Sequence, residues 1–480
     1  MSPGTFSGKW ARKFATNFHT CLSFIVFLWL DFVEVILCVL FRYLDKFFEG
    51  KASACQCLRS NYGIRNEENE VSETLHGRKN IFREMGFLRF PRKWDDSKKT
   101  GIVDHEVMKN SHRWSDCGCE SCVSWMNNCV QDDEQKLHVQ IKEPLQEGIE
   151  GSRESTAAIE NVIFLHGFLS SSSFWTETVF PNLSDHQSNN YRLFAVDLLG
   201  FGRSPKPRDK LYTLRDHFEM IEKSVISQFD LKSFHLVAHS MGCIIALALA
   251  AKHPNIVRSI TLVAPPCFPD SRDGAASLAV LKRVAEKRLW PLPTFGTAIM
   301  SWYEHLGRCL CFFICRHHRT WENILKLLTQ RRELHFLIMD LTKHTHQSAW
   351  YSMHNVICGA AGHIDGYLET LVKSGVKVCV IHGDRDQTAP VECSHYIKTK
   401  VPDADINIIS KAGHKTVALE FKLLEFKQCK FCCRLCYGME NFENERVIED
   451  MPLETFEPTI GMLFDGYEEM FEFYKAYGRQ

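Results

Sequence analysis

Short apolar runs recur along the chain from residue 161 onward and predict the strands of a sheet. Six of them, rich in Val, Ile, Leu and Phe, read NVIFLH, YRLFAVD, FHLVAH, SITLVAP, VKVCVIHG and DINIIS. Their apolar residues are continuous rather than alternating, as in strands that are covered on both faces. Longer stretches separate the runs, including MGCIIALALAAKHP from Met241, and these predict helices. The pattern therefore predicts an α/β fold with a mostly parallel central sheet and helices on both faces.

The polarity of the chain suggests four stretches. Residues 1–54 are a hydrophobic signal or anchor segment, and residues 55–154 form a polar, cysteine-containing linker or pre-domain. Residues 155–420 contain the α/β domain, and residues 421–480 form an atypical C-terminal extension with many acidic and aromatic side chains. A helical insertion at about 268–362 precedes VKVCVIHG, where a lid over the carboxyl ends of the strands is expected.

The hydrophobic N-terminus is typical of a secretory signal or a signal anchor. Three basic residues precede an apolar run from Cys21 to Leu30, and the run then continues to Phe41. Asp31 and Glu34 interrupt it, and an acid near the centre of a membrane span costs roughly 2.5 kcal/mol or more. The two acids argue against an ordinary transmembrane helix. The alternative is an amphipathic helix that rests on a membrane or on the domain.

The twenty cysteines and the charge balance limit the classes of partner. The small residues at 52–54 resemble a signal cleavage site, which makes Cys55 a candidate for lipid attachment. The cysteine clusters suit disulfides in an oxidising compartment and zinc ligands in a reducing one, but none has a clean second pair at zinc-finger spacing. The histidines of RHHRTW also lack carboxylates or cysteines at metal spacing, so no metal is expected. A net charge of −1 gives no sign of nucleic-acid binding and favours a small or lipidic substrate.

Ser240 is the candidate nucleophile. It follows the apolar run FHLVAH and precedes the helix predicted from Met241, so it lies at the corner between a strand and a helix. Such a corner exposes the serine hydroxyl in strained backbone geometry and requires small residues on both sides. Gly242 meets this requirement. Ala238 stands where the usual Gly-x-Ser-x-Gly pattern has its first glycine, and it adds only one methyl group.

An acid and a base follow Ser240 in the chain. Asp386 and the competing Asp384 follow the run VKVCVIHG, and His414 follows DINIIS. In a parallel sheet, side chains at the carboxyl ends of neighbouring strands meet at one edge. The order serine, acid, histidine is that of α/β-hydrolases. His414 would take the proton from Ser240, and the acid would fix the histidine tautomer.

The oxyanion hole requires two backbone N–H groups. The N–H of Met241, directly after the nucleophile, is one expected donor. The loop LHGFLSSSSFW provides the other, because His166 and Gly167 turn the chain and place the N–H of Phe168 next. We expect His166, and His239 beside the nucleophile, to have packing or hydrogen-bonding roles in this motif.

These motifs together resemble the α/β-hydrolase superfamily over residues 161 to about 418. HGF at His166, DLLGFGRS, AHSMG, HGDRD and a final GH occur in the superfamily order. The superfamily pattern places the acid three residues after a glycine and before a turn ending in proline, which selects Asp386 through Gly383 and Pro390. The segments RKWDD and SDCGCESCVSWM, with the hydrophobic N-terminus, resemble the plant BODYGUARD family.

The resemblance implies a lysophospholipase-like serine esterase that acts on lipid or acyl esters without a cofactor. Members of the BODYGUARD family are regarded as lysophospholipases or related acyl hydrolases of cuticle formation, placed at the plasma membrane, cell surface and cell wall. An acyltransferase that polymerises cutin would use the same triad. The alternative to an enzyme is a non-catalytic, lipid-binding hydrolase-like protein. That hypothesis predicts that the triad is incomplete. The extension after the GH motif departs from the single closing helix of the superfamily, and no function is assigned to it.

Overall fold

The computed structural model describes residues 24–41, 43–44, 80–85, 116–117, 119, 136–144, 159–183, 190–207, 210–267, 302–330, 332–386 and 388–414. The chain forms two compact units. The first consists of residues 1–69, 73–109 and 278–310, and the second of residues 70–72, 110–277 and 311–480. The central sheet and the candidate site both belong to the second unit.

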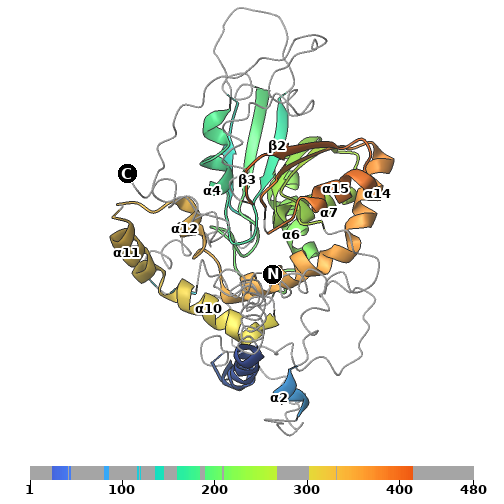
Figure 1. Cartoon of the computed structure of the whole chain (residues 1–480). Coiled ribbons are helices and arrows are strands. Elements are labelled where there is room, and N and C mark those ends of the chain that lie inside the picture. Colours follow the sequence, from blue (N-terminus) through green and yellow to red (C-terminus); the bar gives the residue numbers. More distant parts are fainter. Residues whose placement is uncertain are drawn as a thin grey trace, which may run out of the picture. The chain divides into compact units, whose positions relative to one another are not determined.

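The second unit is built on a seven-stranded sheet in the order β1-β3-β2-β4-β5-β6-β7 (Figure 1). The strands after β1 are mutually parallel. Their bounds are β2 Glu160–Leu165, β3 Tyr191–Val196, β4 Phe234–His239, β5 Val257–Val263, β6 Lys377–Gly383 and β7 Asp405–Ile409. All six of these strands lie within the apolar runs or overlap them. The predicted α/β class with a mostly parallel sheet is confirmed.

The first strand of the sheet was not predicted. β1, Val139–Lys142, pairs antiparallel with β3 at the edge of the sheet. It lies inside the stretch 55–154 that was expected to be a linker or pre-domain, so the sheet begins upstream of the expected boundary at 155. The reason is physical: an edge strand of four residues reading VQIK is too short and too polar to stand out as an apolar run.

Helices cover the two faces of the sheet. α7, Met241–Lys252, packs on β2, β4 and β5, with α6, Leu214–Ile221, and α14, Ile364–Ser374, beside it (Figure 1). On the other face, the short helix α4, Ser173–Thr176, inserts two aromatic side chains into an apolar cluster with alternate residues of the strands. α15, Glu392–Lys400, packs on β6 and β7.

The segment between β5 and β6 is helical where the structure describes it. It contains α10 Glu304–Arg316, α11 His318–Thr329, α12 Phe336–Asp340 and α13 His346–Ser352. α11 ends at Thr329, and its C-cap residue Gln330 adopts a left-handed conformation with φ of 52°. The first part of the expected lid, 268–301, lies outside the described residues.

The first unit contains the hydrophobic helix Phe24–Phe41, which is long and apolar enough to cross a membrane by length and composition, with a mean hydropathy of 2.6. Signal sequences and buried core helices share these properties. Both acids of this helix are buried. Asn80 donates a hydrogen bond to the backbone carbonyl of Asp31 at 2.9 Å. The Glu34 carboxylate accepts hydrogen bonds from the backbone N–H groups of His305 and Leu306, each at 3.0 Å. The two acids therefore lie on the inner face of the helix.

Candidate active site

Ser240 occupies the corner between β4 and α7 in a strained conformation. Its backbone angles are φ 51° and ψ −119°, a combination that side-chain-bearing residues rarely adopt and that costs on the order of 1–3 kcal/mol. The surrounding structure holds it there: the Ser240 N–H donates to the Val263 carbonyl at 2.9 Å, and the Ser240 carbonyl accepts from the Cys243 N–H at 2.9 Å. The corner turns the serine hydroxyl out of the sheet toward His414.

Two glycines make room for this corner. A Cβ atom on Gly242 would lie 2.7 Å from the backbone carbonyl oxygens of both Leu165 and His166, neither of which is the end of a flexible side chain. A Cβ on Gly167 would lie 2.7 Å from the His239 ring. Ala238, in contrast, is fully buried within β4 and keeps its place in the ladder between β2 and β5. The strict need for glycine therefore lies after the serine rather than before it.

The structure brings Ser240, His414 and Asp386 together from three parts of the chain. The Oγ of Ser240 lies 2.8 Å from Nε2 of His414, and Nδ1 of His414 lies 2.7 Å from Oδ2 of Asp386. A carboxylate only accepts, so Nδ1 carries the ring proton and donates it, which leaves the Nε2 lone pair facing the serine hydroxyl. This is the arrangement of a serine nucleophile with its general base and orienting acid.

Asp386 is held as a buried anion. Its Oδ1 accepts hydrogen bonds from the backbone N–H groups of Thr388 and Ala389, both at 2.8 Å. Burial alone would raise the pKa of Asp386, but the charge of His414 and the hydrogen bonds from His382, His414 and Ala389 outweigh it and hold the pKa well below its usual value. The carboxylate is therefore ionised at every pH near neutrality and can stabilise an imidazolium at His414.

Asp384 does not take part in this arrangement. Its Oδ1 accepts the Lys411 N–H at 2.6 Å, and its Oδ2 lies 3.3 Å from the Ser410 hydroxyl. Both partners lie on the turn that follows β7, and the Asp384 side chain is exposed. Asp384 thus supports the turn that leads to His414, while Asp386 contacts the histidine ring itself.

Two further histidines support the triad: His239, for which a packing or hydrogen-bonding role was expected, and His382, whose role was not evident from local sequence. His239 stacks on Phe174 with ring centroids 4.5 Å apart, and its Nε2 lies 3.0 Å from the backbone carbonyl of His414, to which it donates. His382 places Nε2 2.7 Å from the Ala389 carbonyl and 3.4 Å from Oδ2 of Asp386. The first therefore fixes the backbone of His414, and the second fixes the loop of the acid.

His166 orients the loop that carries the expected oxyanion donor. The Leu198 N–H donates to Nε2 of His166 at 2.9 Å, so Nδ1 carries the proton and donates it to the Gly167 carbonyl at 2.7 Å. Burial lowers the pKa of His166, which keeps the ring neutral and maintains this tautomer. Since the peptide unit is planar and trans, fixing the Gly167 carbonyl fixes the Phe168 N–H in the opposite direction.

The N–H of Met241 is available for the same purpose by its place in α7. It belongs to the first residue of that helix, and the first N–H groups of a helix have no partner within the helix. The positive end of the helix dipole also lies at this point, which favours a developing negative charge. Met241 directly follows Ser240, and a Cβ atom on Gly167, the neighbour of Phe168, would lie 3.1 Å from the Cβ of Ser240. Both expected donors therefore belong to segments beside the corner, and their role in an oxyanion hole stays a prediction.

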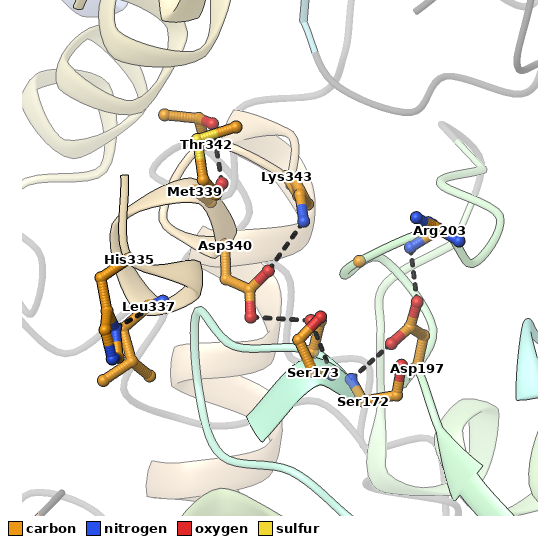
Figure 2. Close-up of polar contacts among 12 residues, drawn as sticks. Ser172, Ser173, Asp197, Arg203, His335, Leu337, Met339, Asp340, Thr342 and Lys343 are labelled. Carbon is orange, nitrogen blue, oxygen red and sulfur yellow. Dashed lines mark hydrogen bonds and ion pairs between the residues drawn. The ribbon is translucent and has the colours of Figure 1, made fainter. Parts of the chain in front are cut away.

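Two buried acids fasten the serine-rich loop that follows Phe168 (Figure 2). Asp197, directly after β3, accepts the Ser172 N–H at 2.5 Å and the Arg203 N–H at 2.7 Å. Asp340, on α12, accepts a hydrogen bond from the Ser171 hydroxyl at 2.7 Å and forms an ion pair with Lys343 at 3.0 Å. Figure 2 shows the two carboxylates on opposite sides of this loop. The contact with Asp340 was not predicted, because it joins residues 169 positions apart.

Some predicted features lie outside the described residues. These are Cys55 and the extension after residue 420. His414 is the last residue that the structure describes, so the expected departure of the C-terminal extension from a single closing helix stays a prediction.

The comparisons with known proteins agree with the class that this fold and geometry define, an α/β-hydrolase. Residues 160–299 match the family model of the alpha/beta hydrolase fold. Three relatives from Arabidopsis thaliana are named "Probable lysophospholipase BODYGUARD" 4, 5 and 1. BODYGUARD 4 is 52% identical over 85% of this chain and 94% of its own. BODYGUARD 5 is 51% identical over 86% and 94%, and BODYGUARD 1 is 38% identical over 85% and 94%. The chain belongs to the BODYGUARD family.

Proposed function

We propose that this α/β-hydrolase is a serine esterase that cleaves acyl esters of lipids, with a lysophospholipid as the first substrate class to test. The observation that carries the proposal is the unbroken line of contacts from Ser240 Oγ through the His414 ring to Asp386, at 2.8 Å and 2.7 Å. The names of the relatives support lysophospholipids as the substrate class.

The proposed reaction runs in two halves. The Ser240 hydroxyl attacks the ester carbonyl as His414 takes its proton, and the N–H groups of Phe168 and Met241 bind the developing oxyanion. His414 then returns the proton to the leaving alcohol, which gives an acyl-serine. In the second half, His414 deprotonates a water that attacks this acyl group and releases the fatty acid. Asp386 stays ionised throughout and stabilises the imidazolium.

Transfer of the acyl group to a hydroxyl of a growing polyester would use the same residues. In that case an alcohol takes the place of water in the second half, and the exclusion of water decides the outcome. A non-catalytic, lipid-binding role predicts a disrupted triad, and the distances among Ser240, His414 and Asp386 favour the enzyme instead.

The test is turnover of defined acyl esters by the full-length protein in detergent. Lysophospholipids and hydroxy-fatty-acid esters are incubated with the native chain and with Ser240→Ala, and the released fatty acids and transfer products are measured. We expect release or transfer by the native chain and a loss of roughly 10⁴-fold or more in Ser240→Ala. No turnover of lysophospholipid would remove that substrate, and no turnover of any ester would contradict the enzyme.

We further propose that the protein enters the secretory pathway and acts at the plasma membrane or cell wall in cuticle formation, with its N-terminal helix retained as a membrane anchor. Glu34 on this helix contacts Nδ1 of His305 at 2.7 Å. Burial alone would lower the pKa of His305, but hydrogen bonds to Cys38 and Glu34 and nearby carboxylates raise it to about 10. The helix is thus joined to α10 by a buried ion pair, whereas Phe24 and Trp29 are 63% and 62% exposed.

The retained anchor is tested by the mass of the mature N-terminus and by flotation with phospholipid vesicles. We expect residues 24–41 to be present in protein purified from a eukaryotic secretory host. We also expect Trp29→Ser to reduce flotation, because Trp29 is an exposed apolar side chain on this helix. A mature chain that begins after residue 54, or native protein that does not float, would contradict the anchor.

A further inference from the structure

Three potential metal ligands meet away from the triad. Cys117 and Cys119 lie in the polar stretch before the sheet, and His318 is the first residue of α11. The Sγ atoms of the two cysteines and a ring nitrogen of His318 all lie within 4.8 Å of one another. All three residues belong to the second compact unit. We propose that this cluster, Cys117, Cys119 and His318, is a structural zinc site.

The distances fit a tetrahedral ion. Zinc binds thiolate at ~2.3 Å and imidazole at ~2.0 Å, so a tetrahedral centre places sulfur and nitrogen ligands about 3.5 Å apart. Sγ of Cys119 lies 3.6 Å from Nε2 of His318. Two thiolates and an imidazole are ligands that suit zinc, whereas magnesium and calcium prefer oxygen ligands. A fourth ligand from outside these three residues completes the tetrahedron.

The histidine is oriented as a ligand. Nδ1 of His318 lies 2.8 Å from Oε1 of Glu322, one turn further along α11. Because the carboxylate only accepts, Nδ1 carries the proton, and in the neutral ring the Nε2 lone pair faces the sulfur of Cys119. A carboxylate behind the ring of a histidine ligand is the usual outer partner at zinc sites and raises the basicity of the ligand.

The cysteine segment is positioned for binding. The Cys119 N–H donates to Sγ of Cys117 at 3.2 Å, and such a bond favours the thiolate form that zinc requires. The preceding residue, Asp116, is buried and accepts hydrogen bonds from the N–H of His346 at 2.8 Å and from its Nδ1 at 2.9 Å. Asp116 therefore holds the segment at the start of α13, and zinc would tie the same segment to α11.

The proposed zinc site revises the expectation of no metal. That expectation rested on spacing along the chain, where no cluster has a clean second pair at zinc-finger spacing and no carboxylate or cysteine was recognised at metal spacing from the RHHRTW histidines. The contact between Cys119 and His318 spans 199 positions and arises only in the fold. The proposed role is structural: the ion fastens the segment before β1 to the helical region between β5 and β6, and no catalytic step depends on it.

The test is the zinc content of the full-length protein, purified in detergent without chelators. The native chain is compared with three single variants, Cys117→Ser, Cys119→Ser and His318→Gln. His317→Gln, an exposed neighbour on the same stretch, and Cys309→Ser are the matched controls. We expect about one zinc per chain in the native protein and both controls and loss of zinc in the three variants. Glu322→Gln keeps all three ligands and should weaken zinc binding by about 10-fold or more.

Cobalt substitution of the native chain gives a readout that needs no variant. Tetrahedral cobalt with thiolate ligands gives intense visible bands and thiolate charge-transfer bands in the near ultraviolet, and we expect both. Absence of zinc and of these bands in folded protein would overturn the proposal. So would zinc that persists in the His318→Gln and cysteine variants, or a disulfide between Cys117 and Cys119 in non-reducing peptide maps. None of these readouts depends on esterase activity, so failure here leaves the proposed function untouched.

Discussion

His414 connects the two halves of the candidate site through its two ring nitrogens. One faces Ser240 and the other faces Asp386, and the backbone carbonyl of the same residue accepts from His239. The ring and the backbone of His414 are therefore both fixed before substrate arrives. Such preorganisation lets the base act without rearrangement in the transition state.

The two neighbouring aspartates have separable roles. In Asp386→Asn the N–H groups of Thr388 and Ala389 would hold the amide oxygen, so the NH2 group faces Nδ1 of His414 and favours the wrong tautomer; we expect kcat to fall by about 10⁴-fold. Asp384→Asn changes only contacts to the turn after β7, so we expect kcat within about a few-fold of the native value. Steady-state hydrolysis of a soluble acyl ester measures both variants. Equal losses in the two variants, or a larger loss in Asp384→Asn, would contradict the assignment of Asp386.

The triad positions could be predicted because each lies in a short motif at the end of an apolar run. The supporting contacts could not. Asp340, His239 and His382 act through partners that the fold brings together or through ring orientations that no motif encodes. Local sequence therefore indicates the three residues of the candidate triad, whereas the groups that hold them depend on tertiary packing.

Among the elements, the corner between β4 and α7 depends on close contact with the end of β2. Gly242, the second residue of α7, lies against the carbonyl oxygens of Leu165 and His166. The six apolar runs could be recognised because both faces of these strands are covered. β1 escaped prediction since an edge strand of four residues needs little apolar surface.

Gly242→Ala tests this contact. The new Cβ would meet backbone oxygens at 2.7 Å, so β2 or α7 must shift, and we expect a loss of about 1–3 kcal/mol in stability and of activity as well. Gly366→Ala, inside α14 with no atom within 4 Å of the added Cβ, is the matched control. We expect it to be neutral or to stabilise by about 0.5–1 kcal/mol. Thermal unfolding compares the two, and a harmless Gly242→Ala would contradict the described packing.

In the molecule as a whole, the second unit contains buried histidines that resist protonation. His217, on α6, is fully buried beside Ser352, and burial lowers its pKa to about 4 from the ordinary 6.5. His344, before α13, is buried in the same way with a pKa of about 4. Both are neutral in the native protein near neutral pH, so their packing is suited to uncharged rings.

This burial makes stability depend on pH in a defined window. Between pH 6.5 and 4 the unfolded chain binds a proton at His217 that the folded chain does not, so the free energy of unfolding falls as the pH falls. The pKa of His217 falls from 6.5 in the unfolded chain to about 4 in the folded protein, which corresponds to about 3 kcal/mol of folding stability. This stability is fully present above pH 6.5 and is lost by pH 4. Urea unfolding at several pH values should therefore show a smaller pH dependence for His217→Gln than for the native chain. The exposed His317→Gln should behave as the native chain does; an unchanged slope in His217→Gln would contradict the buried neutral ring.

The whole molecule also contains contacts that spacing along the chain cannot predict. The fold class follows from the order of apolar runs, and the family follows from motifs that extend over most of the chain. The cluster of Cys117, Cys119 and His318 and the ion pair of Glu34 with His305 join segments about 200 residues apart or more, so only the folded chain places them together.

The role of Ser240 as a nucleophile activated by His414 can be tested without knowledge of the substrate, by labelling with a fluorophosphonate, which reacts with activated serines. The full-length native protein and Ser240→Ala are treated in parallel, and the modified peptide is identified by mass spectrometry. We expect stoichiometric labelling at Ser240 in the native protein and none in Ser240→Ala. A folded native protein that does not label, or a Ser240→Ala variant that labels equally, would show that Ser240 is not the activated nucleophile.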